Sequence, residues 1–169
     1  KHVHRMHPYL GKFVPQLVEI FLRKYQPRIV CDPFCGSGTT LVEATALGID
    51  SIGCDISLFN CLLTKVKTNG YDLDLLDREI RDICHKAVGE AQGMLLEEGA
   101  GYDVSEYLRQ WFAPQALATL RKYRKLIDQY TYQDVLKVIL SRAARSARLT
   151  PHFDLDFPKA PQTEPYYCY

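Results

Sequence analysis

The chain has 169 residues, of which 47% are hydrophobic and 24% are charged, and this length favours one domain with an ordinary core. The sequence contains no signal peptide and no apolar run of membrane-spanning length, so we expect no association with a membrane. We therefore expect a cytoplasmic protein whose six cysteines are reduced thiols.

The formal net charge of +1 hides an asymmetry along the chain. Residues 1–108 contain 11 Lys and Arg residues against 15 Asp and Glu residues (−4), and residues 109–148 contain 9 against 2 (+7). Residues 149–169 contain 1 against 3 (−2). One sign of charge concentrated in a segment is typical of a surface that faces nucleic acid. A solvated helix face explains the same pattern and remains an alternative.

Helices and strands are predicted to alternate over the first 70 residues. The apolar spacing in Val14–Tyr25 predicts an amphipathic helix, and the apolar run Ile29–Cys31 predicts a strand. A helix is expected over about 39–47, and a second strand over 51–56. A third helix, capped by Ser57, is expected to end near residues 69–70. This order indicates an α/β unit with parallel strands.

The loop over residues 32–40, Asp-Pro-Phe-Cys-Gly-Ser-Gly-Thr-Thr, joins the first strand to the second helix. Gly36 and Gly38 permit positive φ angles, and the start of the helix offers free N–H donors to a carboxylate or a phosphate. Asp32 ends the first strand and suits an ammonium group. Asp55 ends the second strand, about where a ribose-binding acid is expected. Together these acids fit a ligand with an amino-acid part and a nucleoside, such as S-adenosylmethionine. An ordinary glycine turn with a helix-capping Asp remains the alternative.

The second half of the chain is predicted to be helical. Residues 72–106 contain ten acids and three bases and predict one long helix with a joint near 97–101, and no third strand is visible. Further helices are expected from Pro114 to about Gln129 and from about Tyr132 to Leu149. The aromatic pair Trp111-Phe112 is expected to pack against the long helix, with base stacking as the alternative.

Three arginines recur every third residue near the end of the last predicted helix: Arg142, Arg145 and Arg148. Because arginine binds phosphate through a bidentate fork, these residues are candidates for nucleic-acid binding. Ion pairs with the acidic segment 72–106 are the alternative. The neighbouring alanines are expected to allow close helix packing. After Pro151 the Pro- and Tyr-rich residues 151–169 predict an extended tail.

The loop over residues 32–40, followed by Glu43 and Ala44, closely resembles the cofactor loop of the amino-group DNA methyltransferases, which modify adenine N6 or cytosine N4. Residues 7–15 resemble the segment that precedes this loop, and residues 53–57 resemble the family's ribose-binding strand end. The resemblance is specific over about residues 4–69 and weaker at 111–114 and 141–169.

This resemblance implies an α/β, partial Rossmann-like methyltransferase fold with an added helical segment. The implied organisation is a cofactor-binding region at 1–70, a helical insertion at 71–150 that faces nucleic acid, and a tail at 151–169. The implied cofactor is S-adenosyl-L-methionine, and the implied partner is double-stranded DNA with a flipped base. The expected cofactor-binding residues are His7, Tyr9, Lys12, Phe13, Asp32, Pro33, Phe34, Cys35, Gly36, Ser37, Gly38, Thr39, Thr40, Asp55 and Ile56. No metal site is expected, because no C-x-x-C pair occurs.

The family's catalytic motif, (Asp/Asn/Ser)-Pro-Pro-aromatic, holds the target amino group, and this chain contains no Pro-Pro pair. We therefore expect no catalytic residues here. The chain is expected to be the cofactor-binding part of a longer or split enzyme and to be inactive alone, with the motif on a C-terminal part or a second polypeptide. The alternatives are an RNA methyltransferase that acts on a guanine amino group and a non-catalytic cofactor- or DNA-binding partner subunit.

Overall fold

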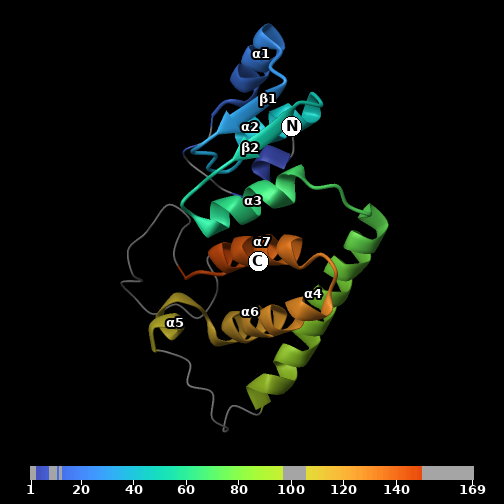
Figure 1. Cartoon of the computed structure of the whole chain (residues 1–169). Helices are drawn as coiled ribbons and strands as arrows, with labels where there is room; N and C mark the ends of the chain where they lie inside the picture. The colour runs from blue at the N-terminus through green and yellow to red at the C-terminus, as the bar shows by residue number, and fades with distance from the viewer. Residues whose placement is uncertain (1–2, 8–10, 12, 97–105, 150–169) are drawn as a thin grey trace. The chain divides into compact units, whose positions relative to one another are not determined.

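The computed structural model describes residues 3–7, 11, 13–96 and 106–149 (Figure 1). It divides the chain into two compact units, residues 1–71 and residues 72–169. The expected joint near 97–101 and the expected tail at 151–169 lie outside the described residues. Among the helices that the structure describes, none is long and apolar enough to cross a membrane.

The first unit is built on a parallel sheet of two strands, β1 (Ile29–Asp32) and β2 (Asp50–Gly53). Ile29 lies opposite Asp50, and Asp32 lies opposite Gly53. The pairing continues one step further, because the Cys54 N–H donates to the Asp32 carbonyl oxygen at 3.0 Å. Helix α2 (Thr39–Ala46) connects the strands and packs against both of them. The predicted α/β unit with parallel strands is confirmed.

Two more helices, α1 (Pro15–Tyr25) and α3 (Leu58–Thr68), pack against α2 (Figure 1). The first helical position of α1 is Pro15, where a missing N–H costs no helical hydrogen bond. The predicted Ser57 cap of α3 is confirmed, because the Ser57 side chain accepts a hydrogen bond from the Asn60 N–H. Local signals therefore set where each of these helices begins.

The sheet has a strongly exposed apolar face. Burial alternates along both strands, and Ile29 and Ile52 retain 57% and 56% of their possible exposure. On α1, Leu17 and Phe21 are exposed as well. Parallel sheets are usually covered on both faces, and a two-stranded sheet alone is marginally stable. The exposed face of the sheet therefore has the composition of one that another structural layer covers.

The second unit is helical, with α4 (Leu73–Leu96), α5 (Glu106–Trp111), α6 (Pro114–Leu126), the 3₁₀ turn η2 (Ile127–Gln129) and α7 (Gln133–Ser146). One buried cluster joins α4, α6, η2 and α7 through Ile83, Ala87, Tyr123, Leu126, Ile127 and Leu136. The long helix and the two later helices are confirmed, and the short α5 was not predicted.

A second buried cluster contains Ala113, Ala116, Leu120, Ala147 and Leu149, with Ala143 and Ala144 packed against it. The expected close packing of the alanines is therefore confirmed. Phe112 packs on this same cluster and pairs as a β-bridge with Arg148. Packing of the aromatic pair on the long helix stays a prediction, and the structure places Phe112 against the segment that follows α7.

A buried carboxylate ties α4 to the turn before α7. Glu79 accepts hydrogen bonds from the backbone N–H groups of Thr131 and Tyr132 at 2.8 and 3.0 Å. Burial acts to raise the pKa of Glu79, but the hydrogen bonds from Tyr132 and Thr131 outweigh it, and the pKa is lowered. The carboxylate thus satisfies two N–H groups just before α7 begins.

Candidate functional site

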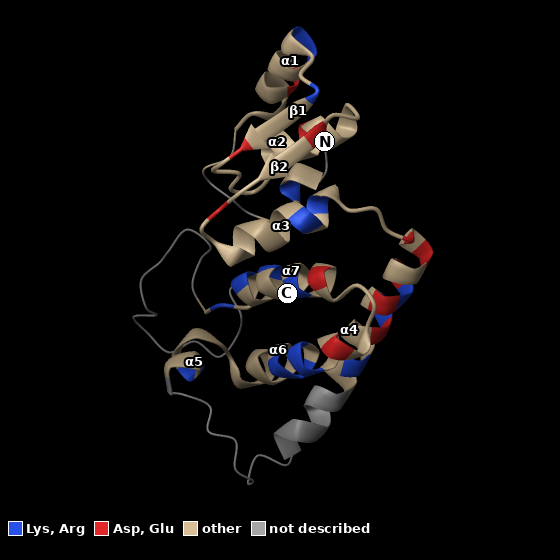
Figure 2. Cartoon of the chain, in the orientation of Figure 1, with Lys and Arg blue, Asp and Glu red and all other residues tan. Residues whose placement is uncertain are grey.

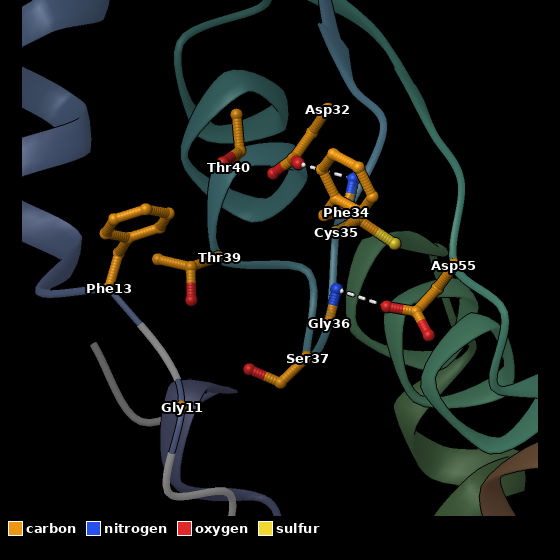
Figure 3. Close-up of a pocket in the computed structure, with 10 residues that line it drawn as sticks. All are labelled: Gly11, Phe13, Asp32, Phe34, Cys35, Gly36, Ser37, Thr39, Thr40 and Asp55. Atoms are coloured by element: carbon orange, nitrogen blue, oxygen red, sulfur yellow. Dashed lines mark hydrogen bonds between the residues drawn. The ribbon is translucent and has the colours of Figure 1, made fainter.

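A pocket of about 210 Å³ lies in the first unit where the loop after β1 enters α2 (Figure 3). This is the carboxyl edge of the sheet, where ligands bind in open α/β folds. The pocket is lined by Gly11, Phe13, Asp32, Phe34, Cys35, Gly36, Ser37, Thr39, Thr40 and Asp55. Nine of these ten residues belong to the expected cofactor-binding set, and Gly11 does not.

The acids at the two strand ends line this one pocket. Asp32 is the last residue of β1, and its Oδ1 accepts the N–H of Phe34 at 3.2 Å. Asp55 follows β2 by two residues. Because the strands are parallel and in register, both carboxylates lie at the same edge of the sheet.

Asp55 also organises the loop (Figure 3). Its Oδ2 accepts the Gly36 N–H at 2.8 Å, and its Oδ1 accepts the Ser57 N–H at 2.8 Å and the Asn60 side-chain amide at 3.0 Å. The pKa of Asp55 is lowered, first by the bond from Ser57 and then by the one from Asn60, with a smaller contribution from Gly36 against the opposing effect of burial. A carboxylate has about four acceptor positions, so roughly one remains for a ligand hydroxyl.

The turn that carries the loop into α2 requires glycine. Gly36 and Gly38 have φ angles of 50° and 76°, in the left-handed region that other residues rarely adopt. A Cβ atom on Gly38 would lie 2.5 Å from the Thr64 Oγ1, so space as well as conformation excludes a side chain there. The turn closes with a 2.7 Å hydrogen bond from the Gly38 N–H to the Cys35 carbonyl oxygen.

Two buried hydroxyl groups line the pocket. Ser37 and Thr39 are 2% and 3% exposed, and neither hydroxyl has a hydrogen-bond partner among the described residues. Figure 3 draws both hydroxyls on the side of the loop that faces Gly11 and Phe13. They adjoin the start of α2, where the first N–H groups of the helix lack intrahelical acceptors. Hydroxyls and helix N–H groups together suit a carboxylate or another anion.

The side chain of Cys35, within the loop, is buried, with its thiol 3.9 Å from the Thr64 hydroxyl. Burial raises the pKa of the Cys35 thiol, although the hydrogen bond with Thr64 acts in the opposite direction. A neutral, buried thiol is a poor nucleophile, so Cys35 contributes packing. By contrast, the side chains of Phe34, which lines the pocket, and Ile56, which follows the pocket residue Asp55 in sequence, are almost fully exposed. We call these two exposed apolar residues the apolar rim.

Other expected residues are placed differently. His7 is buried and packs edge-on against Phe59 of α3, with ring centroids 5.0 Å apart, and it does not line the pocket. Pro33, Gly38 and Ile56 lie in or next to the loop without lining the pocket. Tyr9 and Lys12 lie outside the described residues.

Sequence reasoning missed the α3 residues Thr64 and Lys67, which bind the backbone of the loop. Their only sequence signal is that they are polar and lie three residues apart, on one face of a largely apolar helix.

Figure 2 shows Lys and Arg residues along α6 and α7 in the second unit. The three candidate arginines are not equivalent, because Arg142 is exposed whereas Arg145 and Arg148 are half-buried. The Arg148 guanidinium lies over the Trp111 ring, 5.7 Å from its centroid. Two acids of α4, Asp77 and Asp82, pair with bases of their own helix. Exposure therefore makes Arg142 the most accessible cation of the three.

The family match and the two type II relatives all concern DNA methyltransferases. Residues 12–65 match the DNA methylase family, and this span contains nine of the ten pocket residues. The chain is 35% identical to the type II methyltransferase M.MjaII of Methanocaldococcus jannaschii, over the whole of this chain and 44% of that protein. It is 28% identical to the type II methyltransferase M.MvaI of Kocuria varians, over 86% of this chain and 34% of that protein.

A tRNA (guanine(10)-N2)-dimethyltransferase of Methanocaldococcus jannaschii is 37% identical over 44% of this chain and 21% of that protein. The chain spans less than half the length of each of these three relatives. No solved structure matches it. The family match over residues 12–65 and the similarity to two type II methyltransferases support membership of the chain in the amino-group DNA methyltransferase family.

Proposed function

We propose that the chain is the S-adenosylmethionine-binding part of a DNA methyltransferase that modifies adenine N6 or cytosine N4. One observation carries the proposal: the carboxylates of Asp32 and Asp55 and the buried hydroxyls of Ser37 and Thr39 surround a single pocket. This donor and acceptor set suits a ligand that carries an ammonium group, a carboxylate and a ribose.

Each end of the ligand has a matching group in the proposal. The methionine carboxylate lies near the start of α2 and the two hydroxyls, and the methionine ammonium lies near Asp32. The ribose donates to the remaining acceptor position of Asp55. The adenine contacts the exposed apolar rim of Phe34 and Ile56. The pocket volume of about 210 Å³ is below the roughly 300–1,000 Å³ typical of ligand sites, so the adenine end extends onto this rim.

The remaining residues of the proposed set have supporting roles. Phe13 faces the loop from the opposite wall of the pocket (Figure 3). Tyr9 and Lys12 are proposed to complete that wall. His7 is proposed to act through packing, because its ring lies against Phe59.

The chemistry needs little from this part of the protein beyond positioning. The sulfonium of the cofactor supplies an already activated methyl group, so the protein contributes by orienting donor and acceptor. A base inside a duplex must leave the stack to reach such a site. The residues that hold that base are proposed to lie on another part of the enzyme, because the chain contains no Pro-Pro-aromatic motif and spans 44% of M.MjaII.

The exposed sheet face supports the proposal that a separate part of the enzyme holds the base. Ile29 and Ile52 present apolar surface of the kind that a further layer covers in parallel α/β folds. We infer that the catalytic part, on the same or a second polypeptide, packs there. A non-catalytic cofactor- or DNA-binding partner subunit would have the same surface but would not transfer a methyl group.

RNA is the second candidate substrate, because one relative is named a tRNA (guanine(10)-N2)-dimethyltransferase. DNA is preferred because the two type II methyltransferases align over 100% and 86% of this chain, against 44% for the tRNA enzyme.

The test combines binding with activity. We expect S-adenosylmethionine to bind the chain in a calorimetric titration, and Asp55→Ala to reduce the affinity at least about tenfold, because it removes the ribose acceptor and the Gly36 bond. In the full-length gene product, labelled methyl groups should appear on DNA amino groups and not on RNA.

Asp50→Ala is the matched control, because Asp50 is an exposed acid at the opposite end of β2. It should bind like wild type, and thermal unfolding should show that both variants are folded. Equal cofactor affinity of folded Asp55→Ala and wild type would rule out the ribose assignment. Methyl transfer to RNA alone would replace the proposed substrate.

A further inference from the structure

Helix α3 places a row of polar side chains beneath the glycine turn. Asn60, Thr64 and Lys67 are four and three residues apart, which puts them on one face of the helix. Thr64 and Lys67 are buried, with 5% and 8% exposure. Lysine is among the side chains least often buried, so its position here calls for a specific partner.

That partner is the backbone of the turn. The Lys67 ammonium donates to the Ser37 carbonyl oxygen at 2.7 Å, and the Thr64 hydroxyl donates to the Gly36 carbonyl oxygen at 3.3 Å. Asn60 acts on the turn through Asp55. The Asn60 side-chain amide donates to the Asp55 carboxylate, and this carboxylate accepts the Gly36 N–H. A charged donor makes a stronger hydrogen bond than a neutral one. Two consecutive peptide groups of the turn are therefore held from below.

Holding these carbonyl groups also orients the other side of the turn. In a planar trans peptide the N–H points opposite to the carbonyl, so a Gly36 carbonyl directed at α3 turns the Ser37 N–H away from α3. Gly38 lies directly against Thr64, with no room for a Cβ atom between them. Glycines leave a turn with many accessible conformations, and ordering them on ligand binding costs affinity.

We propose that Thr64 and Lys67 are positioning residues that hold the turn of residues 35–38 in its ligand-binding conformation before the ligand arrives. The ligand is S-adenosylmethionine, so the affinity part of this inference rests on the proposed function. Neither residue lines the pocket, and their effect is exerted through the turn backbone.

The Lys67→Met variant tests the ammonium while keeping an unbranched stem. We expect its affinity for S-adenosylmethionine to fall about tenfold in calorimetry, and the amides of residues 36–38 to exchange with solvent faster than in wild type. In the full-length gene product, KM for the cofactor should rise while KM for DNA stays unchanged. Lys65→Met is the control, because Lys65 is exposed on the same helix, and it should leave all these quantities unchanged.

A second pair of variants isolates the hydroxyl of Thr64. Thr64→Val removes the donor at nearly constant volume, whereas Thr64→Ser keeps it. We expect Thr64→Val to weaken S-adenosylmethionine binding and to speed exchange of the turn amides. Thr64→Ser should stay closer to wild type in both quantities. If Lys67→Met does not fold, this pair decides the question.

The outcomes separate this inference from the proposed function. If wild type does not bind S-adenosylmethionine, the proposed function fails, and amide exchange of the turn still reports on positioning. If wild type binds and the Lys67→Met and Thr64→Val variants, where folded, match it in both affinity and amide exchange, the positioning role is wrong.

Discussion

At the scale of single residues, the Ser37 hydroxyl is the most informative group. It is buried beside the pocket and has no partner among the described residues. Leaving a hydroxyl buried and unpaired costs about 1–3 kcal/mol in proteins. Its neighbour Thr39 has the same property. A ligand that bonds to these hydroxyls removes this cost, and its affinity should depend on them.

Ser37→Ala should therefore separate stability from binding. Because it deletes an unpaired buried group, we expect the free energy of unfolding without ligand to stay the same or rise by up to about 1 kcal/mol. S-adenosylmethionine affinity should fall about tenfold, the equivalent of about 1.4 kcal/mol for one lost hydrogen bond. Urea unfolding and calorimetry measure the two quantities.

Thr45→Ala is the control, because the Thr45 hydroxyl bonds the Leu41 carbonyl oxygen within α2 and lies outside the pocket. Its cofactor affinity should equal that of wild type. A Ser37→Ala variant that binds as tightly as wild type would remove the hydroxyl from the proposed site.

At the scale of elements, Glu79 links α4 to the start of α7. Its carboxylate accepts two backbone N–H groups that precede the helix, so it acts as a cap supplied from a distant element. Because the pKa of Glu79 is lowered on folding, its contribution to stability is complete above its unfolded pKa of about 4.3. That contribution is lost as the pH falls through the folded pKa.

We expect Glu79→Gln to lower the free energy of unfolding at pH 7 by about 1–2 kcal/mol. The reason is that a single neutral amide oxygen replaces the two carboxylate oxygens that accept the backbone N–H groups. The difference from wild type should shrink as the pH falls below about 4, where the wild-type carboxyl becomes protonated. Urea unfolding at several pH values measures both effects.

Asp77→Asn is the comparison, since Asp77 makes an exposed pair with Arg81 on α4. Its effect should stay within about 0.5 kcal/mol. A pH-independent difference between Glu79→Gln and wild type would argue that packing, rather than charge, explains the Glu79 effect.

At the scale of the whole molecule, the positive charge of residues 109–148 is the property most relevant to the proposed DNA partner. The structure divides this charge between two kinds of environment. Arg142 is exposed on α7, whereas Arg148 lies over the Trp111 ring and pairs through its backbone with Phe112. These two arginines should therefore respond differently to substitution.

We expect Arg142→Gln to weaken DNA binding by the full-length gene product and to reduce the slope of log affinity against log salt by about one. Arg148→Gln should instead lower the free energy of unfolding by about 0.5–2 kcal/mol through the lost contact with Trp111. Fluorescence anisotropy at several salt concentrations and urea unfolding measure these effects.

Arg23→Gln provides the control, because Arg23 is an exposed arginine of α1 that pairs with Glu19. It should leave the salt slope unchanged. If Arg142→Gln also leaves the slope unchanged, Arg142 does not contact the phosphate backbone.

The sequence by itself determined the features that depend on near neighbours in the chain. Gly36 and Gly38 predicted the turn, Ser57 predicted the start of α3, and alternating elements predicted parallel strands. The register then brought Asp32 and Asp55 to one edge, as the positions of these acids at the strand ends suggested. Such features follow from backbone conformation and local hydrogen bonding, which a short stretch of sequence specifies.

Only the tertiary structure decided which distant residues meet. Lys67 donates to a carbonyl oxygen 30 residues earlier, His7 packs on Phe59, and Phe112 pairs with Arg148. None of these pairs has a local signal, because each depends on how whole helices pack against one another. The polar face of α3 binds the turn because the packing of α3 in the first unit places this face under the turn.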